Sequence, residues 1–321
     1  MSPSEILKRA ESLFSHLSKC DICPRGCSID RFKYRGVCGV DSRLFISNAI
    51  LHFGEEPPLV KNGGSGTVFF TGCPMKCIYC QNMGFSQMGM GVELSIEELA
   101  FVFNELEKAG AENLNLVTAS HYVPHVLKAL SHAVSNGFDL PVVYNTSSYE
   151  SVETLRYLRG IVDVYLADLR YSDNESGLKY SRVPDYWDVA REALKEMYDQ
   201  VGPFDGVKGL IVRVLVLPGR VTDHKKALDF IAYELSKNVP VSIMRQFIPV
   251  FGARDDEKLS RPLRDEEYEE ILEHADELGL SGWYQLDIRQ KVKTKPVESI
   301  KKMIDSKRVI IPRKGGRKCT R

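Results

Sequence analysis

Three cysteines in one short loop are the residues of this chain best suited to chemistry. Cys73, Cys77 and Cys80 follow directly on the apolar run 68–70. A cubane iron–sulfur cluster takes four cysteine ligands, so three thiolates leave one iron open to another molecule. A structural zinc site is the alternative, but it needs a fourth ligand close by, and a buried strand is an unusual lead into a zinc knuckle. The spacing therefore favours a [4Fe-4S] cluster with one open iron.

A second group of four cysteines stands at metal-ligand spacing nearer the N-terminus. Its members are Cys20, Cys23, Cys27 and Cys38. Four thiolates can close a structural zinc site or hold a complete cubane cluster, and the spacing does not decide between them. The short segment, rich in Arg and Gly, leans toward zinc, and four unrelated buried cysteines are the third interpretation. A metal of either kind would stabilise a segment that is too short to build its own core.

Composition limits the class of protein. The chain has 321 residues, 43% of them hydrophobic, and a formal net charge of zero. It can bury a large core, and no global field favours nucleic acid or a membrane. The run Ser2-Pro-Ser-Glu5 predicts a capped helix start and not a signal peptide, and no apolar run is long enough to span a bilayer. All cysteines except Cys319 fall into the two groups and not into scattered pairs, which predicts a cytoplasmic protein.

Short apolar runs alternate with longer segments of helical period from residue 66 onward, which is typical of parallel β/α units. The expected strands are Thr67–Phe70, Leu114–Val117, Pro141–Tyr144, Val162–Ala167, Leu210–Val216, Val239–Met244 and Trp283–Leu286. Capping signals predict helices that begin at Ser2 and Ser95, and Gly137 is expected to end a helix. Residues 265–278 are expected to form a late helix. Six or more such units predict a whole or partial barrel, whose site forms at the C-terminal strand ends. The expected domains are 1–60, 61–288 and 289–321.

The cysteine loop closely resembles that of the radical S-adenosylmethionine (radical SAM) superfamily. There the open iron binds the amino and carboxylate groups of S-adenosylmethionine, and an electron from the cluster cleaves the sulfonium to release a 5′-deoxyadenosyl radical. The resemblance implies an α/β fold with a partial (β/α)6 TIM-like barrel and an N-terminal cysteine-rich metal-binding segment. It also implies an oxidoreductase with an electron donor such as flavodoxin or ferredoxin. Tyr79, before the third cysteine, matches an aromatic that lies near the adenine.

A closer resemblance covers roughly residues 20–251. The run Cys20-Asp-Ile-Cys-Pro-Arg-Gly-Cys27, then His52-Phe-Gly-Glu-Glu-Pro-Pro58 and Cys80-Gln-Asn82, is similar to the branch related to pyruvate formate-lyase-activating enzyme. Enzymes of that kind abstract a hydrogen atom from one glycine of a partner enzyme. This implies a protein substrate; radical chemistry on a small molecule or RNA is the alternative.

The resemblance implies a role for several polar residues at strand ends. The strand end Val117-Thr-Ala-Ser120 matches the one that leads into a Gly-Gly-Glu turn holding the cofactor's amino group; here His121-Tyr-Val123 replaces that turn, and Ser120 can still accept the hydrogen bond. His121 is either a proton-handling or substrate residue, or a satisfied histidine at a strand end. Arg213, in a buried strand, faces cofactor or substrate unless it forms a structural ion pair. The expected cofactor-binding residues are Tyr79, Gln81, Ser120, Asn145, Asp168, Arg170 and Gln246. Arg170 suits the cofactor carboxylate, with Asp168 orienting it.

The last segment differs in composition. From 289 to 321 there are thirteen Lys or Arg against Glu298 and Asp305. Such a run predicts a solvated or disordered basic tail. A nucleic-acid contact is the sharper interpretation, but no RNA-binding module is recognisable, so a nucleic-acid partner is not expected.

Overall fold

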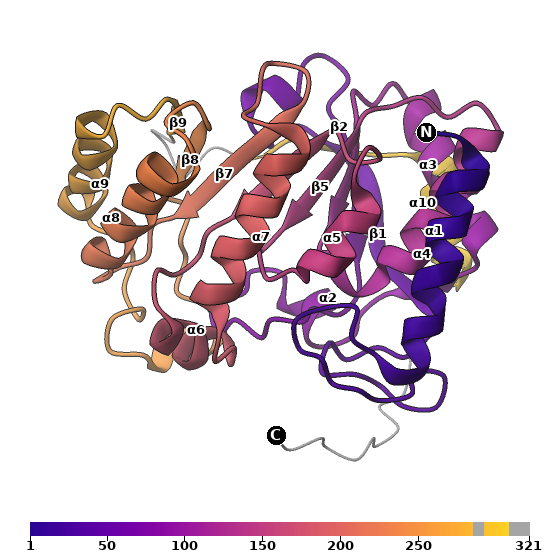
Figure 1. Ribbon diagram of the computed structural model, residues 1–321, viewed down its shortest axis with the longest axis horizontal. Helices are drawn as coiled ribbons and strands as arrows, with labels where there is room; N and C mark the ends of the chain where they lie inside the picture. The colour runs from indigo at the N-terminus through magenta and orange to yellow at the C-terminus, as the bar shows by residue number, and fades with distance from the viewer. Residues whose placement is uncertain (285–291, 308–321) are drawn as a thin grey trace. The chain divides into compact units, whose positions relative to one another are not determined.

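A computed structural model describes residues 1–284 and 292–307 (Figure 1). The chain has a mixed α/β fold, and its mostly parallel sheet is open and not closed into a barrel. The strands are β1 (Leu44–His52), β2 (Ser65–Phe70), β3 (Val92–Leu94), β4 (Leu114–Val117), β5 (Val142–Thr146), β6 (Val164–Asp168), β7 (Gly209–Leu215), β8 (Val241–Met244), β9 (Gly282–Tyr284) and β10 (Thr294–Pro296). The expected fold class is confirmed.

Ten α-helices accompany these strands in the described part of the chain. They are α1 (Pro3–Ser15), α2 (Met83–Ser86), α3 (Ile96–Lys108), α4 (Val123–Ser135), α5 (Val152–Leu158), α6 (Asn174–Ser181), α7 (Tyr186–Val201), α8 (Val221–Phe230), α9 (Asp265–Glu277) and α10 (Glu298–Lys307). The described chain forms two compact units: residues 1–74, 82–143 and 292–307 make the first, and residues 75–81 and 144–284 make the second.

The first unit is built on a mixed sheet. Its β1 pairs antiparallel with β2, β3 and β10, and β2 pairs parallel with β4. Helix α1 packs along α4, as Figure 1 shows. Ser2 forms the expected capping box with Glu5, and Ser95 forms the one with Glu98. Both helix starts are therefore confirmed.

The second unit is a run of parallel β/α pairs. Strands β6, β7, β8 and β9 are parallel neighbours, and α7 packs on β6 and β7. The interior residues of β6 and β7 are apolar and fully buried, whereas Asp168 and Arg213 lie toward their C-terminal ends. A parallel sheet places all such ends at one edge. This edge holds the polar residues that the sequence singles out.

The expected strands agree with the structure to within two residues at each end for the first six. Of the seventh, residues 283–284 lie in β9, and 285–286 fall outside the described residues. Strand β1 is not expected from the sequence: it lies in the segment 1–60 that the sequence analysis assigns to a helix and a metal-binding segment. Its partners are distant in sequence.

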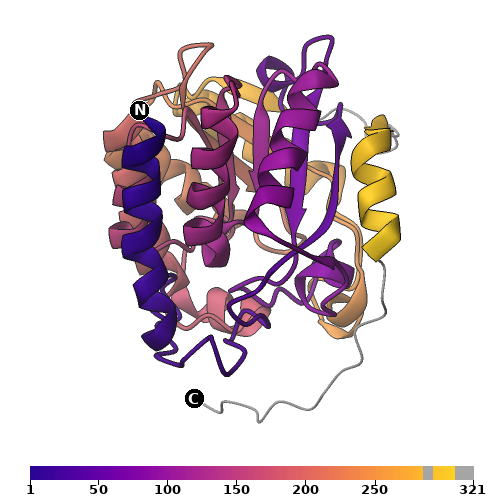
Figure 2. The same ribbon diagram turned by 90° about the vertical axis from the view of Figure 1, so that its right-hand side faces the viewer.

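Part of the basic segment 289–321 folds onto the first unit. Helix α10 buries Ile300 and Ile304 against the unit, and Lys307 pairs with Glu98 of α3. Figure 2 shows α10, in yellow, alongside the strands of this unit. The expectation of a solvated tail therefore fails for residues 294–307, because two isoleucines four positions apart give the basic helix an apolar face. No helix among the residues that the structure describes is long and apolar enough to cross a membrane.

Candidate active site

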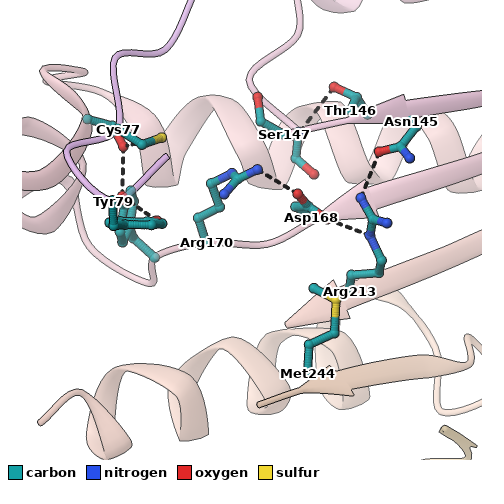
Figure 3. Close-up of polar contacts among 12 residues, drawn as sticks. Cys77, Tyr79, Asn145, Thr146, Ser147, Asp168, Arg170, Arg213 and Met244 are labelled. Carbon is teal, nitrogen blue, oxygen red and sulfur yellow. Dashed lines mark hydrogen bonds and ion pairs between the residues drawn. The ribbon is translucent and has the colours of Figure 1, made fainter. Parts of the chain in front are cut away.

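Asp168 joins two arginines at the strand ends of the second unit. Its Oδ1 accepts a hydrogen bond from Arg213 Nε at 2.6 Å, and its Oδ2 accepts one from Arg170 Nη2 at 2.6 Å. Asp168 and Arg213 are register partners on β6 and β7, so their side chains leave the sheet together. Figure 3 shows the carboxylate between the two guanidinium groups. One carboxylate faces two cations, so this cluster carries a net positive charge.

Arg213 is held by a third strand end as well. Its Nη2 donates to Asn145 Oδ1 of β5 at 2.7 Å, which Figure 3 also shows. Only 13% of the Arg213 side chain is exposed. A charge this buried needs partners, and Asp168 and Asn145 supply them. The ion pair that the sequence analysis weighed as an alternative is therefore present, and a direct role of Arg213 in the reaction stays a prediction.

Arg170 combines a fixed position with an unused donor. Its Nη2 is bound to Asp168, but its shielded Nε atom has no hydrogen-bond partner among the described residues. A buried donor left unsatisfied costs about 1–3 kcal/mol, so such a group normally meets a ligand or water. A carboxylate placed against this guanidinium would accept that bond and offset the net charge of the cluster. The residues therefore fit the carboxylate of S-adenosylmethionine.

Tyr186 organises the same strand ends and is not found by sequence reasoning. Its hydroxyl lies 2.9 Å from the Ser147 carbonyl and 3.1 Å from the Asp168 carbonyl, and it accepts the Arg170 N–H at 2.9 Å. The side chain is fully buried on α7. Tyr186 thus fixes the backbone that carries the two charged residues. Its position at the start of a helix gave no signal, since a tyrosine there ordinarily serves the core.

A chain of hydroxyl groups connects Tyr79 to a cysteine of the loop. Tyr79 Oη lies 2.7 Å from Tyr171 Oη, which lies 2.7 Å from Ser181 Oγ, and Ser181 donates to Cys77 Sγ at 3.0 Å. Tyr79 also meets the Phe247 ring edge-on, with the centroids 6.0 Å apart. The structure therefore places Tyr79 in a buried network beside the metal-binding loop. Its expected proximity to adenine stays a prediction.

Opposing effects act on the charge of the Cys77 sulfur. Burial raises the pKa of the Cys77 thiol, while the Arg170 charge and the hydrogen bond from Ser181 act in the opposite direction. Cys80 follows closely, and its N–H donates to the Cys77 carbonyl at 3.2 Å. Hydrogen bonds to cluster sulfurs are a usual means of tuning iron–sulfur centres. These two ligands therefore fit a cluster.

Gln81 and Gln246, both expected to bind cofactor, contact each other. Gln81 Nε2 donates to the Gln246 carbonyl at 2.9 Å. Gln246 Nε2 lies 3.5 Å from the Met244 sulfur. The contact ties the residue after the cysteine loop to the end of β8. The cofactor roles of both glutamines stay predictions.

In the first unit, His121 supports the residues that lead into Cys73. The His121 ring is buried, and its Nε2 lies 2.8 Å from the Thr71 carbonyl. Because a carbonyl can only accept, this nitrogen carries the proton. Neighbouring Ser120 is also buried. This geometry favours the satisfied-histidine interpretation of His121 over proton handling, and the cofactor role of Ser120 stays a prediction.

The N-terminal cysteines pack against the same stretch of chain. The Cys73 N–H donates to the Cys38 carbonyl at 3.1 Å, and Arg25 Nε donates to the Pro74 carbonyl at 2.8 Å. A Cβ added at Gly36 would lie 3.3 Å from the Cys38 sulfur and 3.5 Å from the Cys27 sulfur, so the two sulfurs approach one glycine. The hydrogen bond from Cys20 lowers the pKa of Cys27 to about 6.

Arg31 provides the test of whether this group of cysteines fits a metal. It is fully buried and donates to the backbone carbonyls of His121 at 2.7 Å and Asp41 at 2.6 Å. No carboxylate pairs with it within the described ranges, and the nearest opposing charges are Cys20 and Cys38. A buried cation of this kind suits thiolates bound to a metal. The structure gathers no complete three-ligand His, Cys, Asp or Glu metal set among its described residues, so the metal assignment stays a prediction.

The backbone is strained at two residues, one after β4 and one after β5. Thr118 follows β4 with φ of 59°, and Ser148 follows β5 with φ of 61°. Residues other than glycine rarely adopt this region, and such strain gathers at functional sites. Ser148 Oγ is buried with no hydrogen-bond partner in the part of the chain described. Both strand ends therefore have conformational features that packing alone does not require.

Comparison with known proteins identifies the family. The family model "Radical SAM superfamily" matches residues 67–231, which include the cysteine loop and the strand ends described above. The chain belongs to the radical SAM superfamily. Membership implies an enzyme with a [4Fe-4S] cluster and S-adenosylmethionine, and such enzymes take an electron from a donor. It does not settle the substrate or the metal at the N-terminal cysteines.

A sequence relative and several solved structures are similar to this chain. An uncharacterised protein of Methanocaldococcus jannaschii is 32% identical over 86% of this chain and 78% of its own length. A domain of pyruvate-formate lyase-activating enzyme from Bacteroides vulgatus is 13% identical with a TM-score of 0.37, covering 48% of this chain and 85% of that domain. Streptococcus suis SuiB, bound to its precursor peptide, is 10% identical with a TM-score of 0.48, covering 66% and 46%.

Proposed function

We propose that this radical SAM enzyme cleaves S-adenosylmethionine reductively and abstracts a hydrogen atom from a protein, as in glycyl-radical activation. The observation that supports cofactor binding is the cluster of Asp168, Arg170 and Arg213, with its net positive charge and the free donor on Arg170 Nε. The protein substrate is inferred from the resemblance of the N-terminal cysteine segment and the Cys-Gln-Asn run. The reaction would take place in the cytoplasm with flavodoxin or ferredoxin as electron donor.

The chain's own residues have separate tasks in this proposal. Bound at the cysteine loop, the cluster and S-adenosylmethionine would supply the radical that removes the hydrogen atom. Arg170 would bind the cofactor carboxylate, and Asp168 holds that guanidinium in place. Tyr186 fixes the backbone of both residues. Ser181 and Tyr171 hold the Cys77 sulfur and Tyr79 in one arrangement.

The decisive experiment follows the hydrogen atom. Anaerobically reconstituted protein is incubated with dithionite, S-adenosylmethionine and an extract of cells that were grown on deuterated glycine. We expect 5′-deoxyadenosine that contains deuterium, together with a glycine-centred radical in the electron paramagnetic resonance spectrum of the protein fraction. The matched control is the variant with Cys73, Cys77 and Cys80 all changed to Ala.

Two other results would revise the proposal. The first is deuterium-free 5′-deoxyadenosine that forms only when the small-molecule or RNA fraction is added. This result would mean that the substrate is a small molecule or an RNA and not a protein. No 5′-deoxyadenosine from the reconstituted parent protein under any of these conditions would contradict the proposed reaction itself.

A further inference from the structure

A cavity of ≈ 240 Å³ opens in the second unit, beyond the residues assigned above. It lies between the segment after β6 and the start of α8, close after the strand ends that carry Asp168 and Arg213. Its lining is Ser172, Asp173, Gly219, Arg220, Thr222, Asp223, Lys226 and Lys258. A smaller cavity of ≈ 150 Å³ shares Asp173, Arg220 and Lys258 with it. Nearly all of these side chains are polar, so the cavity suits a charged ligand.

Asp223 supplies an unsatisfied group inside this cavity. The residue is 6% exposed, and its Oδ1 accepts from both the N–H and the hydroxyl of Ser172, at 2.8 and 2.5 Å. Its Oδ2 is buried and has no hydrogen-bond partner in the described chain. Burial raises the pKa of Asp223, and its buried Oδ2 can share a proton with a ligand oxygen.

The cations around the cavity are not balanced by carboxylates. Arg220 pairs with Asp173 at 2.8 Å and with Asp223 at 3.4 Å, so it faces both carboxyl groups that line the cavity. Lys226 and Lys258 also line the cavity, and neither forms an ion pair with a carboxylate anywhere in residues 1–284 and 292–307. The two ammonium groups therefore leave the cavity with a surplus of positive charge.

The start of α8 adds donors to the same space. This helix of ten residues begins after Arg220 and has no side-chain cap on its first N–H groups. Helix N-termini of this kind favour anions through these N–H groups and the helix dipole. The Thr222 hydroxyl lines the cavity from the first turn. Backbone donors, a hydroxyl and two lysines without ion pairs among the described residues match the oxygens of a phosphate group, and the buried Asp223 carboxyl can share a proton with it.

We propose that this cavity binds a phosphate group, either free or at the end of a small phosphorylated molecule. Lys226 and Lys258 would balance a doubly negative phosphate, the N–H groups of α8 and Thr222 would donate to it, and Asp223 Oδ2 would fill its remaining bond. The cavity volume of ≈ 240 Å³ is several times the space of about 30 Å³ that one water takes in the liquid. A phosphate group therefore leaves room for a short organic part beside it. Binding there does not depend on the proposed hydrogen abstraction.

The test measures phosphate binding to the full-length protein by calorimetry, with separate titrations of inorganic phosphate, glycerol 3-phosphate and acetate. We expect both phosphates to bind and acetate to bind much more weakly. Changing Lys226 and Lys258 to Met should weaken phosphate binding by about tenfold or more, the effect of losing charged hydrogen bonds. The control is Lys225→Met, on the same helix, because Lys225 pairs with Glu270 and does not line the cavity.

Two further variants keep the proposal open to contradiction. Asp223→Asn should bind phosphate nearly as well as the parent, because the amide nitrogen can donate to a phosphate oxygen while the amide oxygen still accepts from Ser172. Loss of binding by this variant with an unchanged melting temperature would overturn the assigned role of Asp223. If the parent binds no phosphate, or the double lysine variant binds like the parent, the site itself is refuted.

Discussion

The buried arginines of the two units differ in what accepts their hydrogen bonds. In the first unit Arg31 donates to two backbone carbonyls and lies near thiols and the Tyr122 ring, with no carboxylate partner among the described residues. In the second unit Arg170 and Arg213 share the Asp168 carboxylate. Carbonyl acceptors fix a chain segment in place, whereas a shared carboxylate holds two cations ready for a further anion. We therefore expect the first unit to support the N-terminal cysteines and the second to present charge to a ligand.

The largest expected effect separates the two cysteine groups. Replacing Cys73, Cys77 and Cys80 by Ala should abolish reductive cleavage of S-adenosylmethionine and leave the N-terminal metal in place. Elemental analysis should then find either about one zinc or about four irons per chain, according to the type of site. In the parent protein, adding S-adenosylmethionine should change the spectrum of the reduced cluster. An unchanged spectrum would contradict the open iron.

Arg31→Met tests the scaffold side of the comparison. Two buried carbonyls lose their donor at about 1–3 kcal/mol each, so we expect the free energy of unfolding to fall by about 2–6 kcal/mol. The N-terminal metal content should fall with it. Chemical denaturation of the metal-loaded protein measures the change. Arg43→Met is the control, because Arg43 forms exposed ion pairs with Asp41 and Glu93, which contribute less than about 1 kcal/mol.

Arg170→Met tests the ligand side. It should weaken S-adenosylmethionine binding by about 1.5–3 kcal/mol, the scale of a hydrogen bond to a charged group, with a smaller effect on folding. Anaerobic calorimetry and the melting temperature measure the two effects. Arg213→Met is the matched variant, because it removes the other partner of Asp168. A strong loss of stability in Arg170→Met with parent-like cofactor binding would make Arg170 structural.

Each unit also holds a buried histidine whose pKa is lowered by burial. Burial lowers the pKa of His125 to about 4 and that of His224 to about 3. Below pH 6.5 the unfolded chain therefore binds protons that the folded chain does not, and the stability these histidines contribute falls as the pH falls toward 4. Between pH 7 and 5 we expect a loss of about 1–2 kcal/mol for each.

Denaturation at several pH values measures this loss. In the parent protein His224 Nε2 accepts a hydrogen bond from the Leu217 N–H at 2.8 Å. His224→Gln keeps an acceptor for this N–H and should reduce the pH dependence of stability. His16→Gln is the control, because the His16 side chain is 39% exposed and pairs with Asp21 at the surface. Equal pH dependence in all three proteins would show that His224 does not titrate as described.

The smallest expected effect concerns His121. His121→Gln can still donate to the Thr71 carbonyl, so it should cost less than about 1 kcal/mol and retain activity, whereas His121→Phe should lose about 1 kcal/mol or more. Melting temperatures and rates of 5′-deoxyadenosine formation measure both. Inactive but stable His121→Gln protein would restore the proton-handling interpretation.

The sequence by itself determined the features that depend on short stretches of chain. The spacing of Cys73, Cys77 and Cys80 predicted the superfamily, the apolar runs predicted six strands to within two residues, and capping boxes predicted two helix starts. The charged residues after strands pointed to one edge of a parallel sheet. Each of these signals is carried by neighbours in sequence, where spacing and side-chain type are enough.

Only the tertiary structure decided which of these residues act together. The pair of Arg213 and Asp168 joins positions 45 apart, and the contact of Ser181 with Cys77 joins positions 104 apart. Tyr186 and Arg31 gave no sequence signal, because a buried tyrosine or arginine has no meaning until its acceptors are known. The burial of the apolar face of α10 against the first unit is likewise known only from the folded structure. Hydrogen bonds and burial between distant segments depend on the folded chain, and no local pattern encodes them.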